Sequence, residues 1–111
     1  IHNVINQNKD IKIFPGYPKR DFVHIDDIVS ANIHAFQNYD KLSGNCYDVG
    51  LGQAITYEKI LNLIGKPFSY LSENNIPENY QYYTCADPNK FMDGWEPVVS
   101  IEEGLKKLTV S

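Results

Sequence analysis

Two groups of residues have side chains and spacings that could carry catalysis or bind a metal. The adjacent carboxylates Asp26 and Asp27 are suited to acid/base chemistry. Adjacent acids at the start of a helix are better explained by capping and by the helix dipole. The histidines His2, His24 and His34 lack the spacing of metal ligands and are expected at the surface or half-buried. We therefore predict neither a catalytic acid nor a metal site.

A dinucleotide site would need a glycine-rich turn, because only glycine lets backbone N–H groups approach a pyrophosphate at a helix start. Gly50 and Gly52 begin such a pattern, but Ile55 occupies the position of the third glycine. The Walker pattern is also absent, and none of the eight tyrosines has a lysine four residues later. We predict no cofactor-binding residue and no Tyr-x-x-x-Lys pair for proton transfer.

Any binding residue would be positioned by helices that are predicted from their caps and apolar stripes. The first follows Asp26 as N-cap and extends to about residue 38, the second follows Thr56, and the third follows Ser100. Gly65 should end the second helix. The first helix should bury one stripe of apolar residues, which consists of Ile25, Ile28, Val29, Ile33 and Phe36.

Short strands or extended segments should alternate with these helices. They are predicted at residues 11–14, 21–25, 46–49, 68–71 and 80–85. Asp87 and Pro88 should begin a short helical turn, since proline suits the first helical position. Ile1, Val4 and Ile5 have the spacing of a helix already in progress, so we expect a further segment upstream.

Composition and charge favour a single domain over residues 1–111. Of its residues 42% are hydrophobic and 22% are charged, which is typical of one globular domain. The net charge is -4 and the longest basic run is Lys106-Lys107, so nucleic-acid binding and acidic-membrane binding are not expected. The sequence contains no run of ~20 apolar residues, and we expect a cytoplasmic chain with Cys46 and Cys85 as reduced thiols on strands.

One motif carries a resemblance to a known family. Residues 19–27 read Lys-Arg-Asp-Phe-Val-His-Ile-Asp-Asp, and residues 47–52 read Tyr-Asp-Val-Gly-Leu-Gly. In this order they resemble the signature of extended short-chain dehydrogenase/reductase enzymes that act on nucleotide sugars. Residues 80–87 are most similar to the heptose epimerases of lipopolysaccharide-precursor synthesis. The resemblance covers nearly the whole chain but only the carboxy-terminal third of that family.

The resemblance implies an α/β fold in which this chain is the small, substrate-binding portion and the Rossmann domain is absent. It implies that Phe14 and Gly16 contact substrate and that Arg20 and Tyr80 hold the phosphates of a nucleotide sugar. A guanidinium offers a planar fork of donors that suits phosphate oxygens, and a phenol adds a neutral hydrogen bond. The alternative role of Arg20 is a surface ion pair with Asp21 or another acid.

The parent enzyme implied by the resemblance is an epimerase that uses tightly held NADP (or NAD), bound by the missing amino-terminal Rossmann domain. No cofactor is expected on this chain alone, and a homo-oligomer is left open. Two alternatives remain: a related dehydratase or reductase of the same fold, and a stand-alone, non-enzymatic module that binds a sugar nucleotide or a protein. The isolated chain should also expose an apolar face meant for the Rossmann domain.

Overall fold

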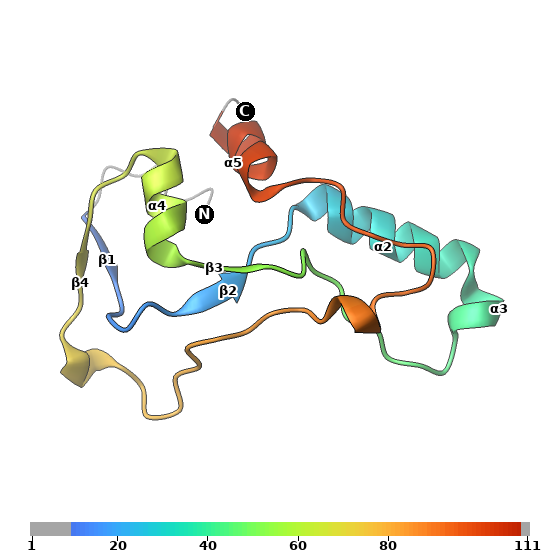
Figure 1. The fold of residues 1–111 in the computed structure, drawn as a ribbon, viewed down its shortest axis with the longest axis horizontal. Helices are drawn as coiled ribbons and strands as arrows, with labels where there is room; N and C mark the ends of the chain where they lie inside the picture. The colour runs from blue at the N-terminus through green and yellow to red at the C-terminus, as the bar shows by residue number, and fades with distance from the viewer. Residues whose placement is uncertain (1–9, 110–111) are drawn as a thin grey trace.

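The computed structural model describes residues 10–109 as an elongated, flat molecule. Its extents are 49 × 36 × 17 Å and its radius of gyration is 16.4 Å, whereas a compact chain of this length would have a radius of about 13 Å. The two ends of the long axis hold different elements, joined by the paired strands at the centre (Figure 1). The expected helix at Ile1, Val4 and Ile5 lies outside the described residues.

Four short strands form two separate two-stranded sheets. Strand β1 (Ile11–Ile13) pairs in parallel with β4 (Phe68–Tyr70), and β2 (Lys19–Asp21) pairs antiparallel with β3 (Ala54–Thr56). The bend at residues 15 and 16 separates β1 from β2. Helices and strands alternate along the chain, so the α/β class is confirmed.

Helix α2 (Ile25–Gln37) and the short α3 (Tyr39–Leu42) form one end of the molecule (Figure 1). The α2 N-cap is His24, whose ring nitrogen accepts from the Asp26 N–H, and not Asp26 as predicted. The buried face of α2 was also predicted wrongly. Ala31 packs there against Met92 and Trp95. Of the predicted stripe, Ile28 is half-buried, whereas the other four residues are exposed, from 48% at Val29 to 85% at Phe36.

Helices α4 (Tyr57–Ile64) and α5 (Ile101–Thr109) pack together at the other end (Figure 1). The predicted caps of α4 are confirmed, because the Thr56 hydroxyl accepts from the Lys59 N–H at 3.2 Å and Gly65 ends the helix in the left-handed conformation. At α5 the Ser100 hydroxyl accepts from the Glu103 N–H. The buried apolar side chains of these two helices are Ile60, Leu61 and Leu105.

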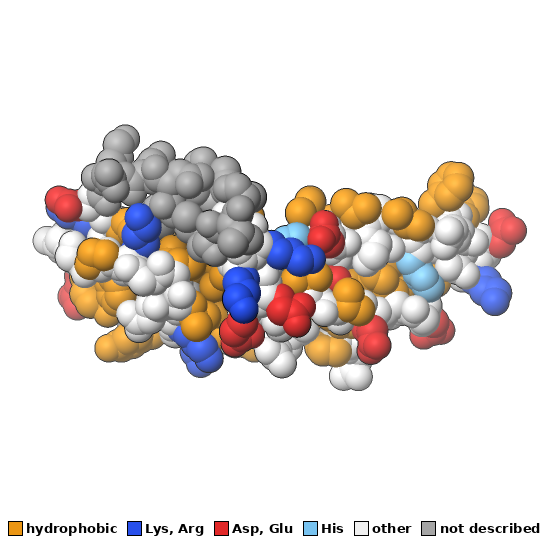
Figure 2. Space-filling view, turned by 90° about the horizontal axis from the view of Figure 1, so that it is seen from above, with side chains coloured by type: hydrophobic (Ala, Val, Ile, Leu, Met, Phe, Trp, Pro, Cys, Tyr) orange, Lys and Arg blue, Asp and Glu red, His pale blue; other side chains and the backbone are white. Residues whose placement is uncertain are grey.

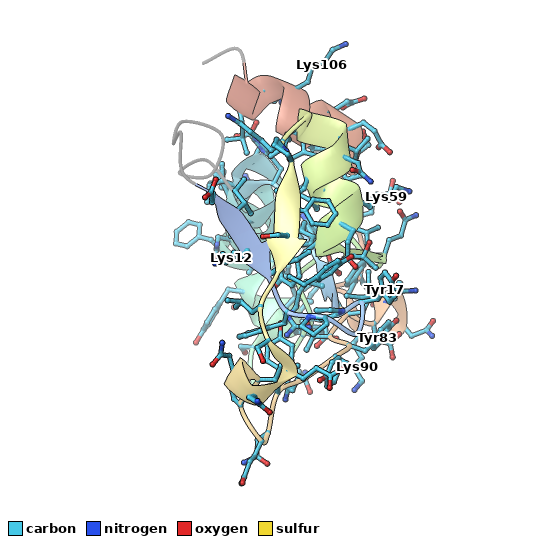
Figure 3. All side chains as sticks on the ribbon, turned by 90° about the vertical axis from the view of Figure 1, so that its left-hand side faces the viewer. Lys12, Tyr17, Lys59, Tyr83, Lys90 and Lys106 are labelled. Atoms are coloured by element: carbon cyan, nitrogen blue, oxygen red, sulfur yellow. The ribbon has the colours of Figure 1, made fainter. Side chains whose placement is uncertain are left out.

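The segment from residue 71 to 100 crosses the whole length of the molecule with little regular structure (Figure 1). It contains two single 3-10 turns, η1 (Glu73–Asn75) and η2 (Pro88–Lys90), the second capped by Asp87 as expected. Residues 80–85 form no strand and make one isolated bridge, from Tyr83 to Lys19. Figure 3 shows Tyr83 on the same side of the molecule as Tyr17 of the β1–β2 loop.

Besides residues 80–85, two further predicted strands differ from the structure. Residues 46–49 form no strand, and the strand predicted at residues 21–25 ends at Asp21. The two cysteines therefore do not lie on strands: Cys46 is exposed, Cys85 is half-buried, and both are free thiols. Residues 46–49 have one described backbone hydrogen bond to a neighbouring segment, from the Asp48 N–H to the Lys90 carbonyl at 2.9 Å, and a single bond does not form a strand ladder.

None of the helices in residues 10–109 is long and apolar enough to cross a membrane.

Candidate functional site

The structure brings the four predicted site residues into one cluster beside β2. The Phe14 and Tyr80 rings meet edge to face, with centroids 4.7 Å apart. The Arg20 guanidinium carbon lies 5.3 Å from the centroid of the Tyr80 ring. Gly16 lies close to Tyr82, whose ring in turn contacts the ring of Tyr80 at 5.3 Å. Residues that are far apart in the sequence therefore share one surface, although their role in binding stays a prediction.

The Arg20 side chain is held by backbone oxygen atoms and not by a carboxylate. Its two terminal nitrogens donate to the carbonyls of Lys19, at 2.8 Å, and Gln81, at 2.5 Å. The ion pair with Asp21 is absent, because the Asp21 carboxylate accepts from backbone N–H groups of Leu51 and Gly52 instead. A guanidinium has five N–H donors. The two carbonyls use two of them, so three are available to an anion.

Tyr80 remains a neutral phenol at this site. Partial burial raises the pKa of Tyr80, and the nearby Tyr57 raises it further, while the Arg20 charge lowers it. A tyrosine pKa above its ordinary value of about 10 leaves the hydroxyl protonated at neutral pH. It is therefore a neutral donor, which complements the charged donor of Arg20.

Gly16 has a structural reason to be glycine. Its φ is +95°, in the left-handed region, and an added Cβ atom would lie 2.8 Å from the Tyr82 ring. Any larger residue would be strained there and would push Tyr82 away from Tyr80. Gly16 thus lets the β1–β2 loop approach the aromatic side chains of the cluster.

Asp21 joins three segments at the back of the cluster, a role that the sequence reasoning missed. Its two carboxylate oxygens accept from the N–H groups of Leu51 and Gly52 at 2.8 Å and from that of Ala86 at 3.2 Å. This network fixes the loop after residue 49 and the segment after Tyr80 relative to β2. No local sequence signal identified this role, because the nearest of these N–H groups, that of Leu51, lies 30 residues along the chain from Asp21.

The same contacts show that the Gly50–Gly52 loop does not fit a dinucleotide. Its N–H groups at Leu51 and Gly52 already donate to Asp21, so they cannot cradle a pyrophosphate. A Cβ atom at Gly52 would lie 2.8 Å from Pro88, so the space beside this glycine is filled by protein. The Gly50–Gly52 loop therefore does not fit the pyrophosphate of NAD(P).

Asp26 and Asp27 have structural roles that the helix dipole only partly explains. Asp27 is fully buried and accepts from the N–H groups of Val98, at 2.9 Å, and Val99, at 3.0 Å. Asp26 is exposed and pairs with Lys107 at 3.2 Å. The pair thus fastens the last loop and α5 to the start of α2. In residues 10–109 no group of His, Cys, Asp and Glu side chains could hold a metal ion.

Comparison with known proteins shows which family the chain resembles. The model of the NAD dependent epimerase/dehydratase family matches residues 1–50. The chain is 32% identical, over 96% of its length, to ADP-L-glycero-D-manno-heptose-6-epimerase of Brachyspira hyodysenteriae, and it covers 36% of that protein. It is 34% identical, over 93% of its length, to UDP-glucuronate 4-epimerase of Thermodesulfobacterium geofontis and covers 33% of it.

A solved structure supports the same assignment. UDP-glucose 4-epimerase of Thermotoga maritima, determined with UDP-glucose, matches 98% of this chain with a TM-score of 0.73 and 27% identity. The chain covers 36% of that structure, so it spans about a third of the relatives that it matches. Shared sequence and shared fold both lead to one conclusion. The chain is similar in sequence and in fold to members of the NAD dependent epimerase/dehydratase family.

Proposed function

We propose that this chain is the substrate-binding part of an NAD(P)-dependent nucleotide-sugar epimerase, and specifically of an ADP-glycero-manno-heptose 6-epimerase. The observation that carries the proposal is the pairing of Arg20 with Tyr80 in one cluster. The specific substrate is supported by the identity of 32% to an enzyme of that name. The residues proposed to contact substrate are Phe14, Gly16, Arg20 and Tyr80.

The proposed ligand chemistry is that of a diphosphate. The names of the related enzymes include ADP, UDP and different sugars, and a diphosphate is the part that these substrates share. Arg20 has three unused donors beside a neutral phenol, a set that suits phosphate oxygens. Binding energy from this diphosphate would orient the sugar for a reaction whose groups lie elsewhere in the enzyme.

The remaining parts of the enzyme are assigned to the portion of the relatives that this chain does not match. NADP (or NAD) would bind there, and residues 1–111 would act as one substrate-binding domain. The exposed apolar stripe of α2, which consists of Ile25, Val29, Ile33 and Phe36, is proposed to pack against that portion. The exposure of these four side chains supports this packing, because a contiguous exposed apolar surface often marks an interaction site.

A related dehydratase or reductase is the second candidate, because the family model includes dehydratases. A stand-alone binding module receives no support from the relatives, whose names are those of enzymes. The reading frame upstream of Ile1 distinguishes part of an enzyme from a stand-alone module. A strand-turn-helix with a G-x-x-G-x-x-G pattern followed by a Tyr-x-x-x-Lys pair would exclude the module.

The proposed ligand is tested by titrating the chain with ADP, AMP and adenosine while its backbone NMR resonances are recorded. We expect ADP to bind more tightly than AMP, because the second phosphate engages the remaining Arg20 donors. Shifts should concentrate at Arg20 and Tyr80, and adenosine should leave them unchanged. Equal responses to ADP and adenosine would contradict the proposal. Tighter binding of UDP-glucuronate than of ADP-glycero-manno-heptose would exclude only the specific substrate.

The stripe is tested with a double variant, Ile33→Glu with Phe36→Glu. The unmodified chain should bind an apolar fluorescent dye and self-associate at high concentration, because the stripe forms a contiguous exposed apolar surface along α2. Figure 2 shows hydrophobic side chains following one another over the α2 end of the molecule. We expect the double variant to lose most of both signals in fluorescence and light-scattering measurements.

Val98→Ser is the matched control, because Val98 is 76% exposed but lies outside the stripe. It should leave dye binding and scattering unchanged. A dye-silent monomer for the unmodified chain would count against the packing proposal.

A further inference from the structure

The Arg20 guanidinium lies near two aromatic rings that come from different parts of the chain. Its central carbon is 5.3 Å from the Tyr80 centroid and 6.0 Å from the Tyr57 centroid. Both distances are within the range of about 6 Å at which an aromatic ring attracts a cation. Tyr80 was singled out by the sequence, whereas Tyr57 was not. Tyr57 is therefore a second aromatic neighbour of Arg20, in addition to the predicted Tyr80.

The position of Tyr57 is fixed by regular structure and does not require a ligand. Tyr57 is the first residue of α4 and directly follows β3, in which Ile55 pairs with Arg20. The N-cap bond from Lys59 to Thr56 sets the start of the helix. The Phe22 ring packs edge to face against Tyr57 at 5.7 Å. Tyr80, in contrast, lies in a segment without regular structure.

We propose that Tyr57 is a positioning residue for the phosphate-binding Arg20. This inference rests on the proposed function. The Tyr57 ring and the Gln81 carbonyl keep the guanidinium fork in one orientation before the diphosphate arrives. A free arginine loses much rotamer freedom when it binds, and a prearranged one loses less, so the affinity rises without any new contact to the ligand.

The test compares Tyr57→Leu with Tyr57→Phe by titration calorimetry with ADP as the probe. Tyr57→Leu should weaken ADP binding about 3- to 10-fold, the cost of ordering one flexible side chain. Tyr57→Phe keeps the ring and should stay within about 2-fold. In an Arg20→Ala background, Tyr57→Leu should have no further effect. An equal loss with and without Arg20 would overturn the proposal, since Tyr57 would then act by packing alone.

A second readout reports on Arg20 without any ligand. The Arg20 Nε–H proton resonance should be displaced by the ring current of Tyr57, and it should move in Tyr57→Leu but not in Tyr57→Phe. An unchanged resonance in Tyr57→Leu would also overturn the proposal. Failure of the unmodified chain to bind ADP would instead count against the proposed function, and the resonance would still decide the role of Tyr57.

Two further variants distinguish a specific effect of the Tyr57 ring from a general loss of folding. Phe22→Leu loosens the packing around Tyr57 without changing Arg20 or its two rings, and it should leave ADP affinity within about 2-fold. If Tyr57→Leu does not fold, Tyr57→Met supplies an apolar side chain without a ring, for which the same outcomes apply. A loss in Phe22→Leu as large as that in Tyr57→Leu would contradict a specific role for the Tyr57 ring.

Discussion

Arg20→Ala is expected to weaken binding of an ADP-sugar by about 1.5–3 kcal/mol, which is the usual contribution of a charge-assisted hydrogen bond. This corresponds to a loss of about 10- to 150-fold in affinity. The substitution removes the cation and the three N–H donors that face no protein oxygen. Titration calorimetry of both proteins with the same ADP-sugar measures the difference.

Two neighbouring variants show whether the loss is specific. Lys19→Ala removes a cation from the adjacent, exposed position of β2, and it should change the affinity much less. Arg20→Lys keeps the charge but not the planar fork, and should fall between the unmodified chain and Arg20→Ala. Equal affinities of Arg20→Ala and the unmodified chain would remove Arg20 from the site.

Asp27→Ala is expected to destabilise the chain by about 3 kcal/mol, because it leaves the buried N–H of Val99 and the partly buried N–H of Val98 without an acceptor. For a domain of this size, the midpoint of thermal unfolding should fall by about 10 °C or more. Thermal unfolding followed by circular dichroism measures the change. The last loop should also lose its fixed position against α2.

Asp26→Ala is the control, since it removes the adjacent carboxylate from the same helical turn. Asp26 is exposed, and its carboxylate lies 3.2 Å from Lys107 Nζ and 3.6 Å from His24 Nδ1, so the change should stay within about 0.5 kcal/mol. Similar destabilisation by the two substitutions would mean that helix-dipole effects dominate at this helix start. The assignment of Asp27 as an anchor for the last loop would then be wrong.

Local sequence signals predicted the helices well because these signals depend on few neighbours. The Thr56 cap, the Gly65 end and the Ser100 cap all act within one helical turn, and all are present in the structure. The cap of α2 was predicted two residues late, at Asp26 in place of His24, because a histidine ring nitrogen serves as the acceptor there and not the usual oxygen. The resemblance to the family also gave the members of the cluster, which composition and spacing alone did not.

Features that depend on distant partners were not predictable from local pattern. The apolar stripe of α2 has the periodicity of a buried face, yet the opposite face is buried because Met92 and Trp95 pack against Ala31. Periodicity shows that a face is apolar but not which surface covers it. The roles of Asp21 and Asp27 depend on backbone groups more than 29 residues away, which no local rule identifies.

The thickness of 17 Å leaves room for little more than one layer of side chains between the two broad faces. Burial of apolar side chains therefore stabilises the contact between the two ends of the molecule only weakly. Buried carboxylates that accept hydrogen bonds from distant backbone N–H groups contribute the missing stability. In so thin a molecule, a few carboxylates connect segments that share little apolar contact. Removing one of these carboxylates would therefore free an entire segment and not merely break one hydrogen bond.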